Sequence, residues 1–457
     1  MQTALNGRIL MTEQTHPTAA IKTLGCKLNQ FESEQIREQL ADMGCRIVPF
    51  ETSADIYVIN TCTVTSRTDR DSRRLIRHAK KLNAASFVAV TGCYAEVNPQ
   101  VLRDIPQADL VVGNAGKAQL GHLIRARLDG SLQWPDPDAD GPTCFRGCEH
   151  SLVRRFADHT RAFVKIQEGC DGHCTYCIIP RARGRSRSTP FADVLLQTLR
   201  LVEAGHPEIV LIGTHLGQYG RDLPDGPDLV QVIEKLCRIP DLGRIRLSSI
   251  EPCEVPESLI DLVAGHPKVC RHLHIPLQSG CDSVLKRMAR PYDAAFYAEL
   301  VRRTHLVDPG ICLGADVIVG FPGETQEEFA TTLKMLQALP LSYLHVFTYS
   351  VRPGTPAAEM PDQVDYETKR ARNHVLRDLS EAKRASFARS MIGADLETVL
   401  ERPAKHEPGV LDGLTDNYLR VYTEGSADLL HTLRTVVATA ATDGYLRGSL
   451  ATEAGEV

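Results

Sequence analysis

Short apolar runs alternate with longer amphipathic stretches from residue 20 to about 130, as is typical of parallel α/β units. The β-rich runs 20–26, 55–62 and 87–93 are the expected strands, and each ends in cysteine, at Cys26, Cys62 and Cys93. Their separations of 36 and 31 residues fit one strand, one helix and the return. We therefore expect the three thiols at the carboxyl edge of one parallel sheet, where open α/β sheets bind ligands; unrelated cysteines at strand ends are the alternative.

A second alternation follows residues 131–160, which carry Pro, Gly and Asp without a period and are expected to be a linker. Six further β-rich runs with helical stretches between them predict a partial (βα)6 barrel, whose working face is the carboxyl end of the strands. These runs are 162–170, 208–214, 244–252, 272–278, 312–322 and 343–350. A charged helix is predicted within 361–390, where a solvated face is the simplest interpretation.

The predicted fold class is α/β, with an amino-terminal open parallel sheet, a central partial (βα)6 barrel and a small carboxyl-terminal β-barrel. The β-barrel is expected from the runs 395–402, 418–424 and 432–442. The predicted boundaries are a flexible amino terminus at 1–19, the sheet domain at 20–130, the linker at 131–160, the central barrel at 161–388 and the small barrel at 389–457.

The charge balance excludes a globally basic surface, because 52 Lys and Arg face 57 Asp and Glu for a net charge of −5. Contact with a nucleic acid must then come from a local patch. No apolar run approaches the roughly 18–20 residues that a bilayer span needs, and the start lacks the basic and apolar parts of a secretory signal. We expect a cytoplasmic protein without a membrane partner, in which thiols stay reduced.

Fourteen cysteines must then be divided into packing residues and ligands. Eight are interpreted as small buried or loop residues, because they lie among apolar residues or in loop-like and polar segments. They are Cys45, Cys237, Cys270, Cys312, Cys253, Cys281, Cys144 and Cys148.

The strongest local motif is C-x3-C-x2-C, formed by Cys170, Cys174 and Cys177 after the first strand of the central barrel. A structural zinc site needs four ligands, and neither a fourth cysteine nor a spaced histidine pair follows; His173 is badly placed to complete the set. Thiolates are the usual ligands of 4Fe–4S clusters, normally four of them. Three would leave one iron free for another group.

This motif in this position resembles the radical S-adenosylmethionine (SAM) superfamily, in which SAM binds that free iron. Other stretches are similar to the methylthiotransferase family, from about residue 20 to the β-rich end. They read TLGCKLNQFESE, NTCTVT, TGCYAE, IIPRARGRSRS, HLHIPLQSGCDSVLKRM, DVIVGFPGET and TYSVRPGTPA. The resemblance implies SAM and two 4Fe–4S clusters as cofactors, the second cluster on Cys26, Cys62 and Cys93, and a TRAM-type RNA-binding barrel at the end.

The sequence around the first cysteine most resembles that of enzymes that act on threonylcarbamoyladenosine in tRNA. This resemblance is carried by Thr23 to Lys27, Asn29 and Gln30. Isopentenyladenosine and an aspartate of a ribosomal protein are the alternative substrates. The family's chemistry implies that a 5′-deoxyadenosyl radical takes hydrogen from carbon 2 of the adenine, which then receives a methylated sulfur from the second cluster. A radical is needed because this carbon offers no proton acidic enough for an ordinary base.

The resemblance further implies that both clusters face one substrate base. An electron donor and a sulfur source are required, and their identities stay open; we expect a monomer. The competing hypothesis, from another class, is a non-catalytic zinc or iron–sulfur protein that binds RNA.

Further cofactor contacts are expected at the ends of the barrel strands. Gly213 and Thr214 would approach the amino group of SAM, where a plain turn is the alternative. Ser249, Glu251 and Gln278 would bind its methionyl or ribose parts, where loop capping is the alternative. Tyr176 would shield the cluster or stack on adenine, unless it is a packing aromatic.

Arginines near the predicted clusters are candidates for RNA phosphates. The first patch comprises Arg181, Arg183, Arg185 and Arg187, and the second, which could be a solvated helix face, comprises Arg67, Arg70, Arg73, Arg74, Arg77, Lys80 and Lys81. Residues 391–457 hold five Lys or Arg against eleven Asp or Glu, which is unfavourable for phosphate binding. This terminal segment is expected either to contact RNA through Asn417, Tyr418 and Arg420 or to close the barrel.

Overall fold

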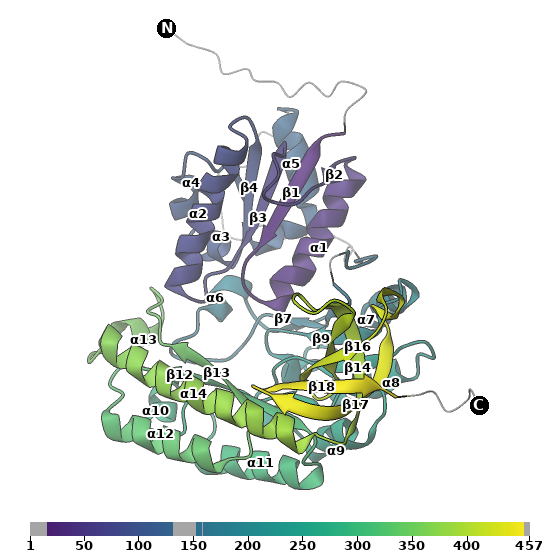
Figure 1. The fold of residues 1–457 in the computed structure, drawn as a ribbon. Coiled ribbons are helices and arrows are strands. Elements are labelled where there is room, and N and C mark those ends of the chain that lie inside the picture. The colour runs from purple at the N-terminus through teal and green to yellow at the C-terminus, as the bar shows by residue number, and fades with distance from the viewer. Residues whose placement is uncertain (1–15, 131–151, 158, 452–457) are drawn as a thin grey trace, which may run out of the picture. The chain divides into compact units, whose positions relative to one another are not determined.

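The computed structural model describes residues 16–130, 152–157 and 159–451, coloured in Figure 1. They divide into two compact units. The first unit is Met1–Val153 with Ile178–Gly184, and the second is Arg154–Cys177 with Arg185–Val457. Most of the expected flexible terminus and linker, with Cys144 and Cys148, lies outside the described residues.

The first unit contains a five-stranded parallel sheet, ordered β2-β1-β3-β4-β5. This confirms the predicted open parallel sheet, although the first strand begins at Thr18 instead of residue 20. The strands are β1 (Thr18–Thr23), β2 (Arg46–Ile47), β3 (Ile56–Thr61), β4 (Phe87–Gly92) and β5 (Leu110–Val111).

Helices cover both faces of this sheet (Figure 1). Ile36 and Leu40 of α1 pack with α5 on one face, and Leu75 and Ile76 of α2 pack with α4 on the other. Successive residues of β3 belong to opposite cores, which explains why its run is continuously apolar. The helices are α1 (Lys27–Asp42), α2 (Ser66–Leu82), α3 (Cys93–Val97), α4 (Pro99–Arg103), η1 (Asn114–Gln119), α5 (Leu120–Leu128) and α6 (Ile179–Arg183).

The second unit contains the six predicted parallel strands as two ladders, β6-β9-β10 and β11-β12-β13. An isolated bridge between Ile245 and Val269 links them, as expected for a partial barrel. The strands are β6 (Ala162–Lys165), β9 (Glu208–Ile212), β10 (Arg244–Leu247), β11 (His272–His274), β12 (Cys312–Val319) and β13 (Tyr343–Thr348).

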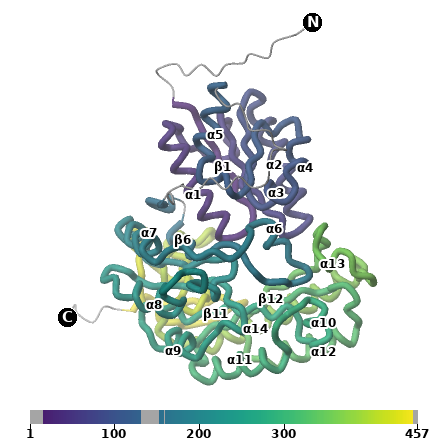
Figure 2. The backbone as a smooth tube through the Cα atoms, turned by 180° about the vertical axis from the view of Figure 1, so that it is seen from behind, coloured from purple at the N-terminus to yellow at the C-terminus, as the bar shows by residue number. Residues whose placement is uncertain are grey.

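Helices between these strands lie outside the barrel (Figure 2). They are α7 (Phe191–Glu203), α8 (Leu229–Cys237), α9 (Glu257–Gly265), α10 (Asp282–Arg287), α11 (Ala294–Val307), α12 (Gln326–Ala338) and α13 (Pro356–Glu359), with the predicted charged helix α14 (Tyr366–Ser390). Short additions are β7 (Gln167–Glu168), β8 (Arg187–Ser188), η2 (Leu216–Gln218) and η3 (Pro252–Glu254). Among the helices that the structure describes, none is long and apolar enough to cross a membrane.

The terminal segment closes into a five-stranded barrel, ordered β14-β15-β16-β18-β17. Three of its strands follow the predicted runs, whereas β15 and β18 were missed. Both contain glycine, and β15 also contains aspartate, residues that are depleted in strands. The elements are β14 (Asp395–Pro403), β15 (Val410–Thr415), β16 (Arg420–Glu424), η4 (Ala427–Leu429), β17 (Leu433–Thr442) and β18 (Tyr445–Leu450).

A buried charge cluster joins this terminal barrel to the central one. Glu208 pairs with Arg244 at 2.7 Å and Arg246 at 2.8 Å, and all three side chains are fully buried. Arg244 donates to the Leu414 carbonyl at 2.9 Å, and Arg246 to the Thr415 carbonyl at 2.9 Å. Burial alone would raise the pKa of Glu208, but the arginines hold it well below its usual range. The two predicted domains are therefore one compact unit.

The loop proposed for RNA contact lies inside this junction. Asn417 is fully buried, and the Tyr418 ring stacks on His272 with centroids 4.2 Å apart. Arg420 pairs with Glu401 and, at 3.2 Å, with Asp412. These contacts agree with the alternative that the terminal segment closes the barrel.

We predict that Glu208→Gln lowers the free energy of unfolding by about 3–5 kcal/mol, because two buried guanidinium groups lose their counter-charge. Chemical denaturation followed by circular dichroism measures the change. Glu257→Gln is the control, since that carboxylate pairs with Arg303 at the surface and should change stability by at most about 1 kcal/mol. Equal effects of the two substitutions would contradict the prediction.

Candidate functional site

The carboxyl edge of the first sheet gathers the three early cysteines. Thr23 pairs in register with Asn60, and Thr61 with Gly92, so the ends of β1, β3 and β4 are aligned. Cys62 and Cys93 directly follow their strands, and Cys26 precedes α1. The thiols of Cys26 and Cys93 lie near enough to act on the pKa of Cys62. The structure thus brings together the residues that strand spacing predicted.

Two glycines allow the backbone to close around these thiols. Gly25 has a φ of 95°, and a Cβ there would lie 2.7 Å from Cys62 Sγ. Gly92 has a φ of 101°, and a Cβ there would lie 2.2 Å from the Thr61 carbonyl oxygen. Both backbone conformations are rare for residues with a side chain. The cysteine cluster therefore depends on glycine at both positions.

The buried Cys62 thiol resists ionisation unless a cation joins it. Cys62 and Cys93 are each 3% exposed, whereas Cys26 is exposed. Burial, together with Cys93 and Cys26, raises the pKa of Cys62 to about 12. A coordinated metal deprotonates a thiol outright. The donor set therefore fits an iron–sulfur cluster or another thiophilic metal, open on its exposed side.

Arg183 organises the backbone that carries two of these cysteines. It donates to Glu32 Oε1 and to Asn29 Oδ1, both at 2.7 Å. The Asn29 amide in turn donates to the Leu24 carbonyl at 2.7 Å and the Thr61 carbonyl at 3.0 Å, just before Cys26 and Cys62. Arg183 is buried, so the structure gives it a positioning role instead of the predicted contact with RNA.

The later cysteines share one loop after β7. Cys170 Sγ lies 3.3 Å from His215 Nδ1 and accepts a hydrogen bond from the Gly172 amide at 3.3 Å. Cys174 Sγ accepts from Arg290 Nη1 at 3.0 Å. All three cysteines of the loop are half-buried, which leaves room for a group that they bind together.

His215 connects this loop to the strand ends. Its Nε2 lies 2.8 Å from Glu254 Oε2, and its backbone amide donates to Gln167 at 2.8 Å. Burial would lower the pKa of His215, but the bonds to Cys170 and Glu254 raise it to about 10. The sequence motifs gave no role to His215, Glu254 or Arg290. Arg290 lies just beyond the family-like stretch that ends at Met288.

The predicted contacts after β9 have features of a ligand site. Gly213 lies against Gln167, and a Cβ there would be 2.9 Å from its Oε1. Thr214 Oγ1 is buried and has no hydrogen-bond partner among the described residues. A buried hydroxyl without a partner is costly, so a polar group of a ligand would stabilise it.

The predicted contacts after β10 and β11 face other polar groups. Ser249 Oγ lies 2.7 Å from His274 Nδ1, and Glu251 pairs with Arg290. Gln278 has a φ of 70° and is held by a hydrogen bond from its amide to the Asp316 carbonyl at 2.8 Å. Such backbone strain in a residue other than glycine clusters at binding sites.

Tyr176 packs edge-on against Phe321, with ring centroids 6.5 Å apart. Burial raises the pKa of its hydroxyl well above the usual range, so the phenol stays neutral. The contact agrees with a packing role, and the shielding of a cluster on the neighbouring cysteines stays a prediction.

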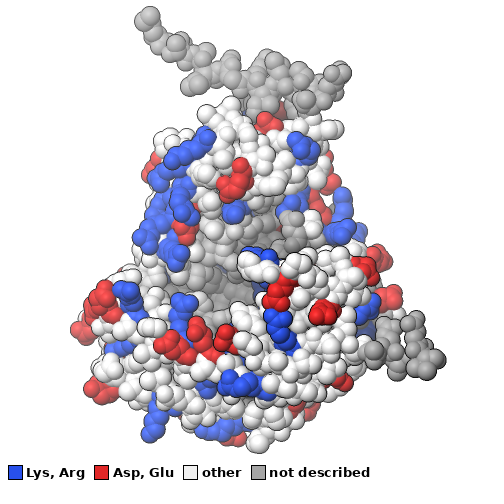
Figure 3. Space-filling view, in the orientation of Figure 1, with Lys and Arg blue, Asp and Glu red and all other residues white. Residues whose placement is uncertain are grey.

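Basic side chains gather over α2 on the face drawn in Figure 3. Asp71 pairs with Arg67 at 3.9 Å and Arg74 at 3.5 Å, and Lys80 pairs with Asp109 at 2.8 Å. These pairs weaken the second patch as a phosphate site. In the first patch Arg181, Arg185 and Arg187 are exposed.

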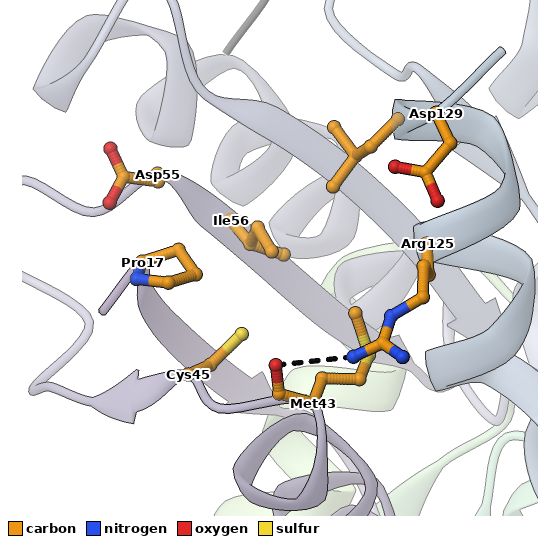
Figure 4. A pocket seen from close by; sticks show the side chains of 8 residues that line it. Pro17, Met43, Cys45, Asp55, Ile56, Arg125 and Asp129 are labelled. Atoms are coloured by element: carbon orange, nitrogen blue, oxygen red, sulfur yellow. Dashed lines mark hydrogen bonds between the residues drawn. The ribbon is translucent and has the colours of Figure 1, made fainter. Parts of the chain in front are cut away.

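A small apolar pocket lies at the opposite, amino-terminal end of the first sheet (Figure 4). Pro17, Cys45 and Ile56 line it, and Arg125 donates to the Met43 carbonyl at 3.3 Å beside them. Because the cysteine cluster follows the carboxyl ends of the strands, this pocket takes no part in it.

Each of the two units matches a known protein family. Residues 18–113 match the uncharacterized protein family UPF0004, and residues 164–336 match the radical SAM superfamily.

Curated relatives span nearly the whole chain. The threonylcarbamoyladenosine tRNA methylthiotransferase MtaB of Bacillus subtilis is 42% identical over 90% of this chain and 92% of its own length. The protein of the same name from Aquifex aeolicus is 37% identical over 92% of this chain and 99% of its own. The tRNA-2-methylthio-N(6)-dimethylallyladenosine synthase of Methylobacillus flagellatus is 33% identical over 94% of this chain and 98% of its own length.

Among solved structures, the radical SAM methyltransferase TsrM from Kitasatospora setae has a similar fold. Its TM-score is 0.56 at 16% identity, with 75% of each chain covered. At this identity the likeness supports the fold alone.

We predict that Gly92→Ala destabilises the first unit by more than the roughly 1–3 kcal/mol of backbone strain, because its Cβ also meets the Thr61 carbonyl. Thermal unfolding monitored by circular dichroism provides the measurement. Gly130→Ala is matched, since Gly130 also has a positive φ but nothing lies within 4 Å of its Cβ position. If both variants unfold alike, the close approach at Gly92 has no energetic consequence.

Proposed function

Because the chain belongs to the family of radical SAM methylthiotransferases, we propose that it adds a methylthio group to carbon 2 of N6-threonylcarbamoyladenosine next to the anticodon in tRNA. The observation that carries the proposal is the pair of cysteine trios, one at the carboxyl ends of parallel strands and one in a single loop after β7, each in the unit that its family match covers. The relatives named for this substrate are more similar to the chain than the dimethylallyladenosine synthases, at 42% and 37% against 33% identity.

Each trio is proposed to hold a 4Fe–4S cluster. Cys170, Cys174 and Cys177 hold the cluster that binds SAM, and Cys26, Cys62 and Cys93 hold the second. When bound, these groups supply radical formation and sulfur transfer, which protein side chains cannot perform. The enzyme requires an external electron donor and a source of sulfur.

The surrounding side chains hold the cluster ligands and the cofactor in place. His215 and Arg290 bind the sulfurs of Cys170 and Cys174, and such hydrogen bonds tune cluster potentials. The Thr214 hydroxyl supplies an unpartnered polar group for SAM. Gly213, Ser249, Glu251 and Gln278 complete the proposed SAM site around these strand ends.

For tRNA, the proposal retains the exposed arginines Arg181, Arg185 and Arg187 as phosphate contacts. Arg183 is removed from the set because its side chain is buried against Glu32. The reaction is placed in the cytoplasm, with its tRNA substrate, and the enzyme is expected to act as a monomer.

The substrate is tested by mass spectrometry of tRNA nucleosides from cells that lack the gene. We expect 2-methylthio-threonylcarbamoyladenosine to disappear and its unmodified precursor to accumulate. A wild-type copy restores the product, and a Cys174→Ala copy does not. Loss of the methylthio group from isopentenyladenosine would select the other substrate, and an unchanged profile would refute a role in tRNA.

Cluster assignment is tested by iron analysis of anaerobically purified variants. We expect Cys62→Ala to lose about half of the iron and to keep SAM cleavage to 5′-deoxyadenosine, because only the second trio is broken. Cys174→Ala should lose a similar amount of iron and all SAM cleavage. Cys45→Ala is the control, since Cys45 is buried in the same unit as Cys62 but belongs to neither trio. Full iron content in Cys62→Ala, or zinc in place of iron, would disprove the assignment.

A further inference from the structure

Three side chains of the kinds that bind metals lie together in the second unit, and none of them belongs to the two cysteine trios. His274 ends β11, Asp316 lies within β12, and His345 lies within β13. Neighbouring parallel strands align them: His274 pairs in register with Gly314, two residues from Asp316 along β12, and Asp316 pairs with His345. The sequence gives no motif for them, because 42 and 29 residues separate their positions.

Their ligand atoms converge on one carboxylate oxygen. Asp316 Oδ1 lies 3.2 Å from His274 Nε2 and 3.3 Å from His345 Nδ1, and the three atoms all lie within 4.8 Å of one another. Two ligands bound to one tetrahedral zinc ion at about 2.0–2.1 Å are roughly 3.3–3.4 Å apart. The two contacts with Asp316 have this spacing, and a rotation of the exposed His345 ring closes the set.

Two of these atoms lack hydrogen bonds in the protein. His274 Nε2 and Asp316 Oδ1 are buried, and neither has a hydrogen-bond partner of normal geometry among the described residues. His274 is only 6% exposed, so this imidazole nitrogen is shielded from water. Burial of polar atoms without partners is unfavourable, and a cation between them would remove the cost.

The surroundings orient the ligands as they do in known metal sites. Ser249 Oγ lies 2.7 Å from His274 Nδ1, and in the tautomer whose Nδ1 donates to this hydroxyl the lone pair of Nε2 is directed at Asp316. A metal-binding histidine typically donates its other ring N–H to such a partner. The Tyr343 ring stacks on the His274 ring with centroids 6.0 Å apart and further restricts its rotation.

We propose that His274, Asp316 and His345 bind one divalent first-row transition ion, such as Zn²⁺. Two imidazoles and one carboxylate are a common ligand set for such ions, and three protein ligands leave at least one position for water or an oxygen atom of a bound molecule. His345 is exposed, so the site is reachable from solvent. The proposal does not rest on the proposed function, because none of its three ligands is a cluster cysteine or a proposed tRNA contact; Ser249, which lies beside His274, is shared with the proposed SAM site.

A proton-sharing cluster is the competing explanation. In that arrangement protonated imidazoles donate to Asp316. Burial would raise the pKa of Asp316, but His274 and His345 lower it below its usual range. A positive charge beside the carboxylate lowers this pKa further, whether protons on the imidazoles or a metal ion supply it. Metal analysis distinguishes the two explanations, because only a metal site retains zinc.

The test uses the full chain with both clusters reconstituted and oxidised, dialysed against micromolar free Zn²⁺ under anaerobic conditions. Zinc and iron per chain are measured by inductively coupled plasma mass spectrometry. We expect about one zinc ion per wild-type chain, and at least a tenfold loss of zinc in Asp316→Asn and His345→Gln. The iron content should stay unchanged, which separates this site from the cysteine trios.

The matched control is His374→Gln on α14. His374 Nδ1 lies 3.1 Å from Asp378 Oδ1 in an exposed pair, and this control should keep its zinc. His345→Gln keeps the test informative if Asp316→Asn fails to fold, because His345 lies at the surface. Zinc that persists in His345→Gln, or a wild-type chain that retains none, overturns the proposal and favours the proton-sharing cluster.

Discussion

The common carboxyl edge of parallel strands is the constraint on which the chemistry of this protein depends. Parallel pairing brings the ends of strands that are 30 or more residues apart to one line, so residues distant in the sequence meet without a shared helix or loop. In the first unit this edge gathers Cys26, Cys62 and Cys93. In the second unit the same constraint collects the residues after β9, β10 and β11 near the later cysteine loop. Sheet geometry thus brings the three early cysteines together, whereas the later three already share one loop.

Alignment alone does not make a binding site, because the buried Cys62 thiol resists ionisation. The first trio therefore combines three features. Glycines let the backbone approach Cys62, an Arg183–Asn29 network fixes the carbonyls that precede two of the cysteines, and Cys26 leaves one side open. Arg183 comes from the segment immediately after the second trio in sequence, although this segment belongs to the first unit. The residue that supports the first trio therefore directly follows, in the sequence, the loop that carries the second trio.

The terminal barrel combines an acidic net charge with a loop that is buried against the central barrel. It is acidic, and its loop residues Asn417 and Tyr418 are engaged at the central barrel, where Arg244 and Arg246 donate to its carbonyls. A buried guanidinium group needs its donors satisfied, and here Glu208 and the carbonyls of the terminal barrel accept from Arg244 and Arg246. At this loop the contacts agree with a segment that closes the barrel.

The sequence by itself determined nine of the parallel strands, the family, and the placing of six cysteines at strand ends or in one loop, since periodicity and motif spacing are local properties of the chain. It did not determine the roles of Arg183, His215, Arg290 or Asn417, nor the meeting of His274, Asp316 and His345. Those depend on which side chains become neighbours after folding, and a charged residue looks the same in the sequence whether it ends in solvent or in a buried pair. Only the tertiary structure decided which arginines are exposed and which are buried in ion pairs, because burial and pairing arise from contacts between distant segments.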